Sequence, residues 1–192
     1  DYAIWAESLL TLSSLCDWVK PGSSAHYIEL AEKITLSALE KFKDKQACGF
    51  YFNEKSINNP AQVQKKFWYD NATPSANSSL LRIFSTLYQI TNKDLWIKEY
   101  RQAQRGYPQY CRKAPQGVGH ALCAITEEAV GISTLSCPPD QTDAVVRELS
   151  HYPYRPIFIS TNNGGKTAVL KIGKTFTEKS DNAVELIKKI FS

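Results

Sequence analysis

The feature of this sequence that most constrains its fold is a helical pattern that recurs after about 70 residues. Ser8-Leu9-Leu10 matches Ser79-Leu80-Leu81 inside one pair of segments, and Tyr27-Ile28 matches Trp96-Ile97 at the opening of the next. A helical hairpin repeated at a fixed spacing is typical of arrays in which each unit buries its apolar face on its neighbours. The repeat therefore predicts an array of antiparallel helical hairpins.

The first 130 residues predict helices wherever apolar residues recur at helical spacing. The expected ranges are 3–16, 25–42, 74–90, 94–104 and 116–129. Thr73 is the expected N-cap of the third helix, with Pro74 at its first position, and Asn92 ends that helix. Residues 48–52 read as a short extended piece. Residues 58–60 (Asn-Asn-Pro) are expected to form a loop.

After residue 130 the pattern changes from helical to mixed. We expect strands over 130–135, 156–160 and 166–172, with a turn at 162–165 that pairs the last two as a hairpin. Helices are expected after Pro138-Pro139 as far as Leu149, and over 181–191. The chain should thus divide into an α-hairpin region, 1–130, and a small α/β subdomain, 131–192.

Composition excludes several classes of protein. Among 192 residues 43% are hydrophobic, which excludes wholesale disorder, and no apolar run is long enough for a membrane span. The net charge of +4 is not gathered into a basic stripe, so no nucleic-acid partner is expected. The five cysteines form no Cys-x-x-Cys and read as reduced thiols of a cytoplasmic protein. The three histidines lie far apart, so no metal and no cofactor are expected.

The chain begins at Asp1 and contains no Met. We interpret it as a fragment of a longer protein or as an incomplete record of one. Such a fragment would leave apolar helix faces without partners, so we expect a partner chain, an oligomer or an exposed apolar patch.

The most polar segment, residues 69–78, offers two interpretations. In the functional one, Asp70 acts as an acid or base at the open end of the array, and Tyr69, Asn71, Ser75 and Asn77 bind substrate. Asp1 precedes the first repeat's helix at the matching place and is a second candidate carboxylate, which would suit sugar chemistry.

In the structural interpretation the same segment only caps a helix. Asp70 and Thr73 then satisfy free amides, while Asn77 and Ser78 lie on the solvated side. Elsewhere, residues 164–167 (Gly-Gly-Lys-Thr) resemble the end of a phosphate-binding loop but lack its first glycine. A hairpin turn is the better interpretation of that segment.

Several of these motifs together resemble the C-terminal part of the YyaL-like, thioredoxin-domain-containing family, which includes a spermatogenesis-associated animal member. They are Asp1-Tyr2-Ala3, Tyr27 with Ala31, the Gly-Phe-Tyr-Phe of 49–52, and the segment from Asp70 to Ser78. The most specific of them is the segment from Asp70 to Ser78. Asn71 and Ala76 depart from it, since both positions are usually glycine in the family.

The resemblance implies a fold, partners and two hypotheses of function. The fold would be an incomplete α/α toroid, similar to six-hairpin glycosidases and sugar 2-epimerases, followed by the α/β appendage. The partners would be an N-terminal thioredoxin-like domain and upstream helical hairpins of the parent chain. One hypothesis is an enzyme-like toroid with Asp70 as acid or base and a carbohydrate ligand. The other is a non-catalytic module that docks the thioredoxin-like domain.

Overall fold

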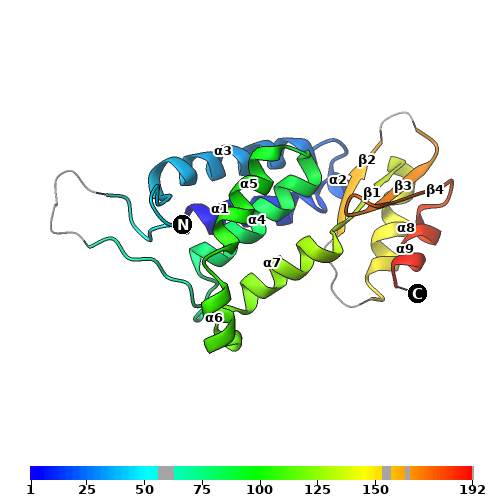
Figure 1. Cartoon of the computed structure of the whole chain (residues 1–192). Coiled ribbons are helices and arrows are strands. Elements are labelled where there is room, and N and C mark those ends of the chain that lie inside the picture. The colour runs from blue at the N-terminus through cyan, green and yellow to red at the C-terminus, as the bar shows by residue number, and fades with distance from the viewer. Residues whose placement is uncertain (56–62, 153–156, 163–164, 192) are drawn as a thin grey trace. The chain divides into compact units, whose positions relative to one another are not determined.

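The chain is mainly helical and ends in a small mixed sheet, as the sequence predicts (Figure 1). The structure, a computed structural model, describes residues 1–55, 63–152, 157–162 and 165–191. It divides into two compact units: unit 1 holds residues 1–9 and 29–129, and unit 2 holds residues 10–28 and 130–192. The sequence analysis had assigned all of residues 1–130 to a single region.

The helices expected from the repeat are present. In and beside unit 1 the helical elements are α1 (Tyr2–Ser13), α3 (Ser24–Phe42), α4 (Ala76–Thr91), α5 (Asp94–Gln104), α6 (Pro108–Lys113), the 3-10 turn Pro115–Val118 and α7 (Gly119–Val130). The sequence analysis missed α6, which begins at a proline and buries none of its residues. A short helix of that kind carries no apolar periodicity.

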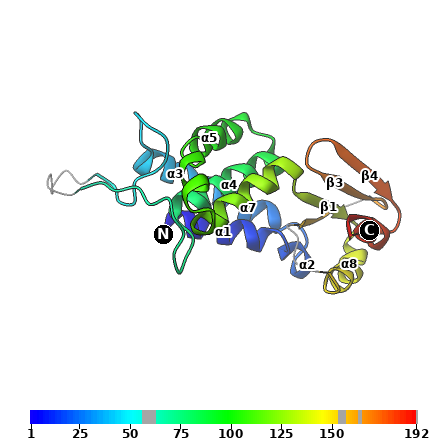
Figure 2. The same cartoon turned by 60° about the horizontal axis from the view of Figure 1, so that its bottom comes forward.

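Helix α4 is the core of unit 1 and lies among α1, α5 and α7 in both views (Figures 1 and 2). Its buried residues run through almost every turn from Asn77 to Leu87. It packs most extensively against α5, where the Phe84 ring stacks at 6.2 Å on the ring of Trp96. At its C-terminus Asn92 takes the left-handed conformation (φ 57°), as expected of the residue that ends this helix.

Helices α1 and α3 form the other antiparallel pair of unit 1. The ring of Tyr2, at the start of α1, packs edge-on against that of Phe42, at the end of α3. Two hairpins of the expected kind therefore exist, but the described helices show no closed ring.

One local prediction in unit 1 was wrong. Ser75, rather than Thr73, is the N-cap of α4, and its side chain accepts a hydrogen bond from Ser78 N. The short extended piece expected at 48–52 contains one isolated antiparallel bridge, between Phe50 and Lys43. The loop expected at 58–60 lies outside the described residues.

Unit 2 is built on a four-stranded sheet with the order β2-β1-β3-β4. Its elements are α2 (Cys16–Val19), β1 (Ser133–Cys137), the 3-10 turn Pro139–Gln141, α8 (Thr142–Leu149), β2 (Ile157–Thr161), β3 (Ala168–Ile172), β4 (Phe176–Ser180) and α9 (Ala183–Phe191). Strands β1 and β2 are parallel and joined through α8, whereas β3 is antiparallel to β1 and to β4. Alternate residues of β1, β2 and β3 form the core with α8 and α9, for example Leu135, Ile159, Leu170 and Leu186.

The expected hairpin between the second and third strands was wrong. The crossover through α8 brings β2 parallel to β1, so β1 lies between β2 and β3 and the hairpin is β3–β4 instead. The sequence analysis missed β4 because its side chains are mostly exposed and polar. The expected turn and the phosphate-loop segment include residues 163 and 164, which lie outside the described residues.

Residues 10–28 belong to unit 2 because they cover the outer edge of β2. Ile159 N donates a hydrogen bond to Ser14 O at 2.8 Å, and Thr161 N donates to the buried Asp17 carboxylate at 2.9 Å. The Trp18 indole N–H donates to Asp143 at the start of α8. An exposed strand edge invites unwanted pairing, and this segment protects β2 from it.

Candidate functional site

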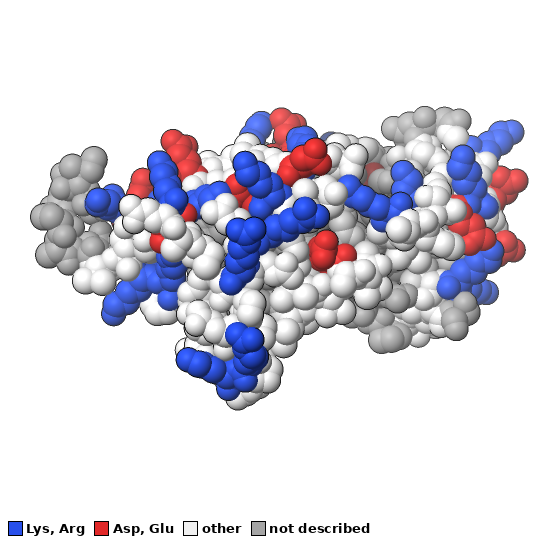
Figure 3. Space-filling model, in the orientation of Figure 1, with Lys and Arg blue, Asp and Glu red and all other residues white. Residues whose placement is uncertain are grey.

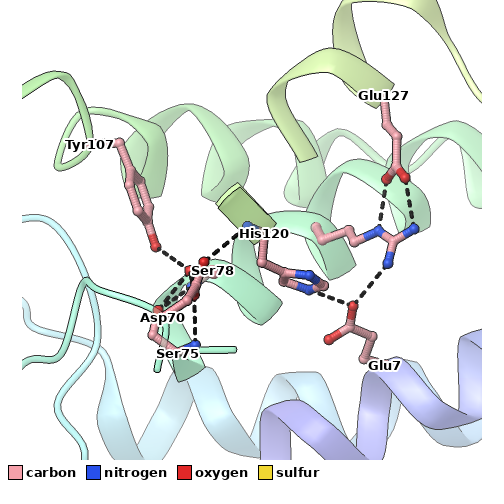
Figure 4. Close-up of polar contacts among 8 residues, drawn as sticks. Glu7, Asp70, Ser75, Ser78, Tyr107, His120 and Glu127 are labelled. Carbon is pink, nitrogen blue, oxygen red and sulfur yellow. Dashed lines mark hydrogen bonds and ion pairs between the residues drawn. The ribbon is translucent and has the colours of Figure 1, made fainter. Parts of the chain in front are cut away.

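Asp70 lies in a hydrogen-bond network at the N-terminus of α4 (Figure 4). Its Oδ1 accepts from Ser75 N at 2.9 Å and from Ser78 Oγ at 2.7 Å. Its Oδ2 accepts from the backbone N–H of His120, at the start of α7, at 2.9 Å. The carboxylate therefore ties the start of α4 to the start of α7, and its contact with His120 spans 50 residues of the chain.

Two neighbours extend this network into the core. Tyr107 donates its hydroxyl proton to Ser78 Oγ at 3.2 Å, and burial raises the pKa of that phenol far above its ordinary value. The Asn77 amide pairs with both backbone groups of Phe50 and also donates to Phe67 O at 2.9 Å. Asn77 and Ser78 are buried, which corrects the expectation that they lie on the solvated side.

A second polar network begins on the other side of His120. Its Nε2 lies 2.7 Å from Glu7 Oε1 on α1. Arg82, on α4, donates from Nη1 to the same Glu7 oxygen at 3.3 Å. Through Nε and Nη2 it also makes a bidentate contact with Glu127 on α7, at 2.8 and 2.7 Å. Helices α1, α4 and α7 are thus connected through the ionic contacts of Glu7, Arg82 and Glu127, one residue from each helix.

The electrostatics of this second network lower the pKa of Glu7. Burial works to raise the pKa of Glu7, but the hydrogen bond and charge of His120 and the charge of Arg82 outweigh it, so that pKa is lowered. An ionised carboxylate only accepts hydrogen bonds, so His120 Nε2 carries the proton that faces Glu7. Nδ1 makes no hydrogen bond to any residue that the structure describes, and in the neutral ring it is a base.

The side chains of this network are largely but not completely buried. His120 keeps 18% of its side chain exposed, Glu7 19% and Arg82 20%. In many enzymes one nitrogen of a partly exposed imidazole is hydrogen-bonded to a carboxylate, and the other nitrogen acts as general acid or base. Glu7 and Nε2 of His120 have this arrangement.

Aromatic rings pack beside Asp70. The Trp68 ring stacks on Tyr110 at 5.3 Å and meets the ring of Tyr107 edge-on. The positive φ of Gly49 (90°) and its closeness to Trp68 both require glycine, because a Cβ there would lie 2.6 Å from the indole. Tyr69 rests against Gly117 and keeps 43% of its surface exposed.

The structure brings together only some of the residues that the sequence analysis proposed. Asp70, Ser75 and Asn77 lie within one cluster at the start of α4. Tyr69 is adjacent in the chain and partly exposed. Asn71 is exposed and its N–H bonds to Thr73 O within its own turn, while Asp1 is exposed at the start of α1. No hydrogen bond joins Asp1 to Asp70 in the described part of the chain.

The sequence analysis missed Glu7, Arg82, Tyr107, His120 and Glu127. The spacing of His120 from other metal-ligating residues indicated only that it is no metal ligand. One signal was available for Glu7, because the register that aligns Ser8 with Ser79 also aligns Glu7 with Ser78, a neighbour of Asp70.

An open pocket of about 270 Å³ lies next to Tyr107, where α5, α6 and α7 meet. Asp70 is not among its lining residues. Within the described ranges no group of three or more His, Cys, Asp or Glu side chains is placed to hold a metal ion. None of the described helices is both long and apolar enough to cross a lipid bilayer.

Comparison of the sequence with known protein families and with curated proteins gave no match. The resemblance to the YyaL-like family therefore stays a prediction.

Proposed function

We propose that unit 1 is the helical part of an enzyme that acts on a sugar-like polyol, with His120 as the group that transfers protons. The observation that carries this proposal is the hydrogen bond of 2.7 Å between His120 Nε2 and Glu7. Glu7 holds the tautomer in which Nδ1 is the base, and it stabilises the imidazolium that forms when Nδ1 takes up a proton from substrate. The substrate class rests on the resemblance to sugar-converting toroids.

Arg82 and Asp70 act on this pair as positioning residues in the proposal. Arg82 contacts Glu7 and is itself held by the bidentate contact with Glu127, which fixes the carboxylate that faces His120. Asp70 accepts the backbone N–H of His120 and so fixes the first turn of α7, from which the imidazole projects. Tyr69, partly exposed beside Asp70, is the proposed contact for the substrate.

The proposal includes further hairpins of the same array on the outer face of α1. Exposed apolar side chains of unit 1 support them. Ile4 and Trp5, both on α1, are 49% and 65% exposed. Upstream hairpins of a parent chain, or a second copy, would cover such a face.

The second candidate function is a non-catalytic module that docks the thioredoxin-like domain of a parent chain. The contacts of Asp70 favour this alternative. Its two oxygen atoms already accept hydrogen bonds from three donors at the starts of α4 and α7, which is a structural role. On this account the network around His120 is a structural link among α1, α4 and α7.

Titration with a panel of sugars and polyols, followed by NMR of the histidine rings, separates the two functions. The enzyme proposal expects saturable shifts of the His120 ring that disappear in Glu7→Gln, and loss of any turnover in His120→Gln. His26→Gln changes an exposed histidine outside the network and is the matched control. If no member of the panel binds while a thioredoxin-like domain does, the enzyme proposal is withdrawn in favour of docking.

A further inference from the structure

Exposed cations follow one side of α5 and continue on α6. Lys98, Arg101 and Arg105 recur at intervals of three and four residues, so they share one face of the helix. Arg112 and Lys113 follow in the last turn of α6. All of these side chains belong to exposed residues of unit 1. Figure 3 shows basic side chains over both helices on the same face of the molecule.

These cations are not neutralised within the described part of the protein. None of the five forms a salt bridge or a hydrogen bond with a described residue. Of the acidic residues on α5, Glu99 is buried and bound to Lys43, and only Asp94 is exposed, at the first turn. The helix dipole accounts for cations in a last turn but not for Lys98, which lies in the middle of α5.

One of these cations, Arg105, lines the pocket of about 270 Å³. Gln104 and Arg105 line it from the end of α5, Pro108 and Cys111 from α6, and Ile125 from α7, with Tyr107 between. Its lining is mainly apolar apart from Arg105 and Gln104. Because it is open to solvent it cannot enclose most of a small ligand, as ligand pockets do. Its size and openness suit one side chain of a larger partner.

We propose that this corner of unit 1 binds an acidic peptide segment of a partner protein. One apolar side chain of the segment occupies the pocket, and carboxylates on either side of it pair with Arg101, Arg105, Arg112 and Lys113. Charge complementarity around an apolar anchor site favours such a partner. A single-stranded nucleic acid fits less well, because Tyr107 is buried and one face of Tyr110 is already stacked on Trp68.

Fluorescence anisotropy with the full chain tests this proposal. The probe is a labelled nine-residue peptide with a central Leu and flanking Asp and Glu residues, compared with the same peptide carrying a central Gly. The double variant Arg101→Gln/Arg105→Gln removes Arg105, which lines the pocket, and the exposed cation one helical turn before it. Lys45→Gln/Lys55→Gln removes two exposed cations elsewhere in unit 1 and matches the charge change.

The Leu peptide should bind saturably, more weakly at higher salt, and more tightly than the Gly peptide. Each arginine should contribute roughly 2- to 5-fold, so the double variant should bind roughly 5- to 20-fold more weakly, with the control unchanged. Equal losses in both double variants would mean attraction by net charge alone and would overturn the proposal. So would indifference to the central Leu, absence of binding, or tighter binding of a single-stranded oligonucleotide of equal charge. Circular dichroism melts that match the parent protein exclude misfolding as the cause.

Discussion

Replacing Asp70 by Asn tests whether this carboxylate holds the starts of α4 and α7 together. The change keeps the size of the side chain and removes one acceptor and the charge. Three donors now point at the two oxygens: Ser75 N and Ser78 Oγ at Oδ1, and His120 N at Oδ2. The amide NH₂ group of Asn cannot accept, so at least one of these donors loses its partner. The arrangement that loses fewest leaves His120 N unsatisfied.

The magnitude follows from these contacts. A hydrogen bond to a charged acceptor contributes about 1.5–3 kcal/mol, and the two that survive lose part of their strength with the charge. We therefore expect unit 1 of Asp70→Asn to be less stable by about 2–4 kcal/mol. For a chain of this length each kcal/mol lowers a melting temperature by about 2–4 °C. The expected decrease is therefore roughly 5–15 °C for the transition that reports on unit 1.

The assay must report on unit 1 separately, because two compact units need not unfold together. Amide hydrogen exchange at His120 and Ser75 does so, and both amides should exchange faster in Asp70→Asn. Asp140→Asn, an exposed carboxylate in unit 2, is the matched control and should leave both rates unchanged. If Asp70→Asn alters neither rate and shifts stability by less than about 0.5 kcal/mol, the carboxylate is not a structural tie. The three hydrogen bonds to Asp70 would then not stabilise unit 1.

Three further predictions follow from single contacts. Gly106→Ala should destabilise unit 1 by about 1–3 kcal/mol in urea unfolding, because the new Cβ would overlap the Trp68 indole. Asp17→Asn should speed amide exchange at Ser24, whose N–H donates to Asp17 Oδ1 at 2.6 Å, because the one oxygen that remains keeps both donors of Thr161; the loss should cost about 1.5–3 kcal/mol. Glu7 has a lowered pKa in the folded protein, so its stabilisation is present above its unfolded value of about 4.3. That stabilisation is lost as the pH falls through the lower folded pKa, so the acid limb of a stability–pH curve should be flatter in Glu7→Gln.

Each of these predictions has a matched control. Gly119→Ala places a Cβ in open space and should not destabilise the protein. Asp140→Asn again serves as the exposed carboxylate, and Glu40→Gln as the exposed glutamate on α3. Controls that behave like their test variants would remove the specific contacts as the explanation.

The sequence determined most of the helices, because apolar periodicity and caps are local properties of the chain. The boundaries of α5 came out as predicted, and those of α3 and α4 were close. The same locality explains the errors. Thr73-Pro74 has good capping chemistry, but Ser75 is the residue whose side chain reaches the amide of Ser78. The polar strand β4 has no local apolar signal, since its side chains are mostly exposed.

Strand order and the membership of each unit were decided only by the tertiary structure. The sequence of residues 10–28 predicts part of a helical region. In the structure Ser14 and Asp17 accept hydrogen bonds from the backbone N–H groups at the edge of β2, more than 140 residues later in the chain. The polar cluster at 70–78 was identifiable from sequence, because Asp70, Ser75 and Asn77 are neighbours in the chain. Glu7, Arg82, His120 and Glu127 were not, because the contacts that unite them join residues 45 to 113 positions apart. Hydrogen bonding and burial depend on which groups meet in space, and only the packing of α1, α4 and α7 brings these side chains together.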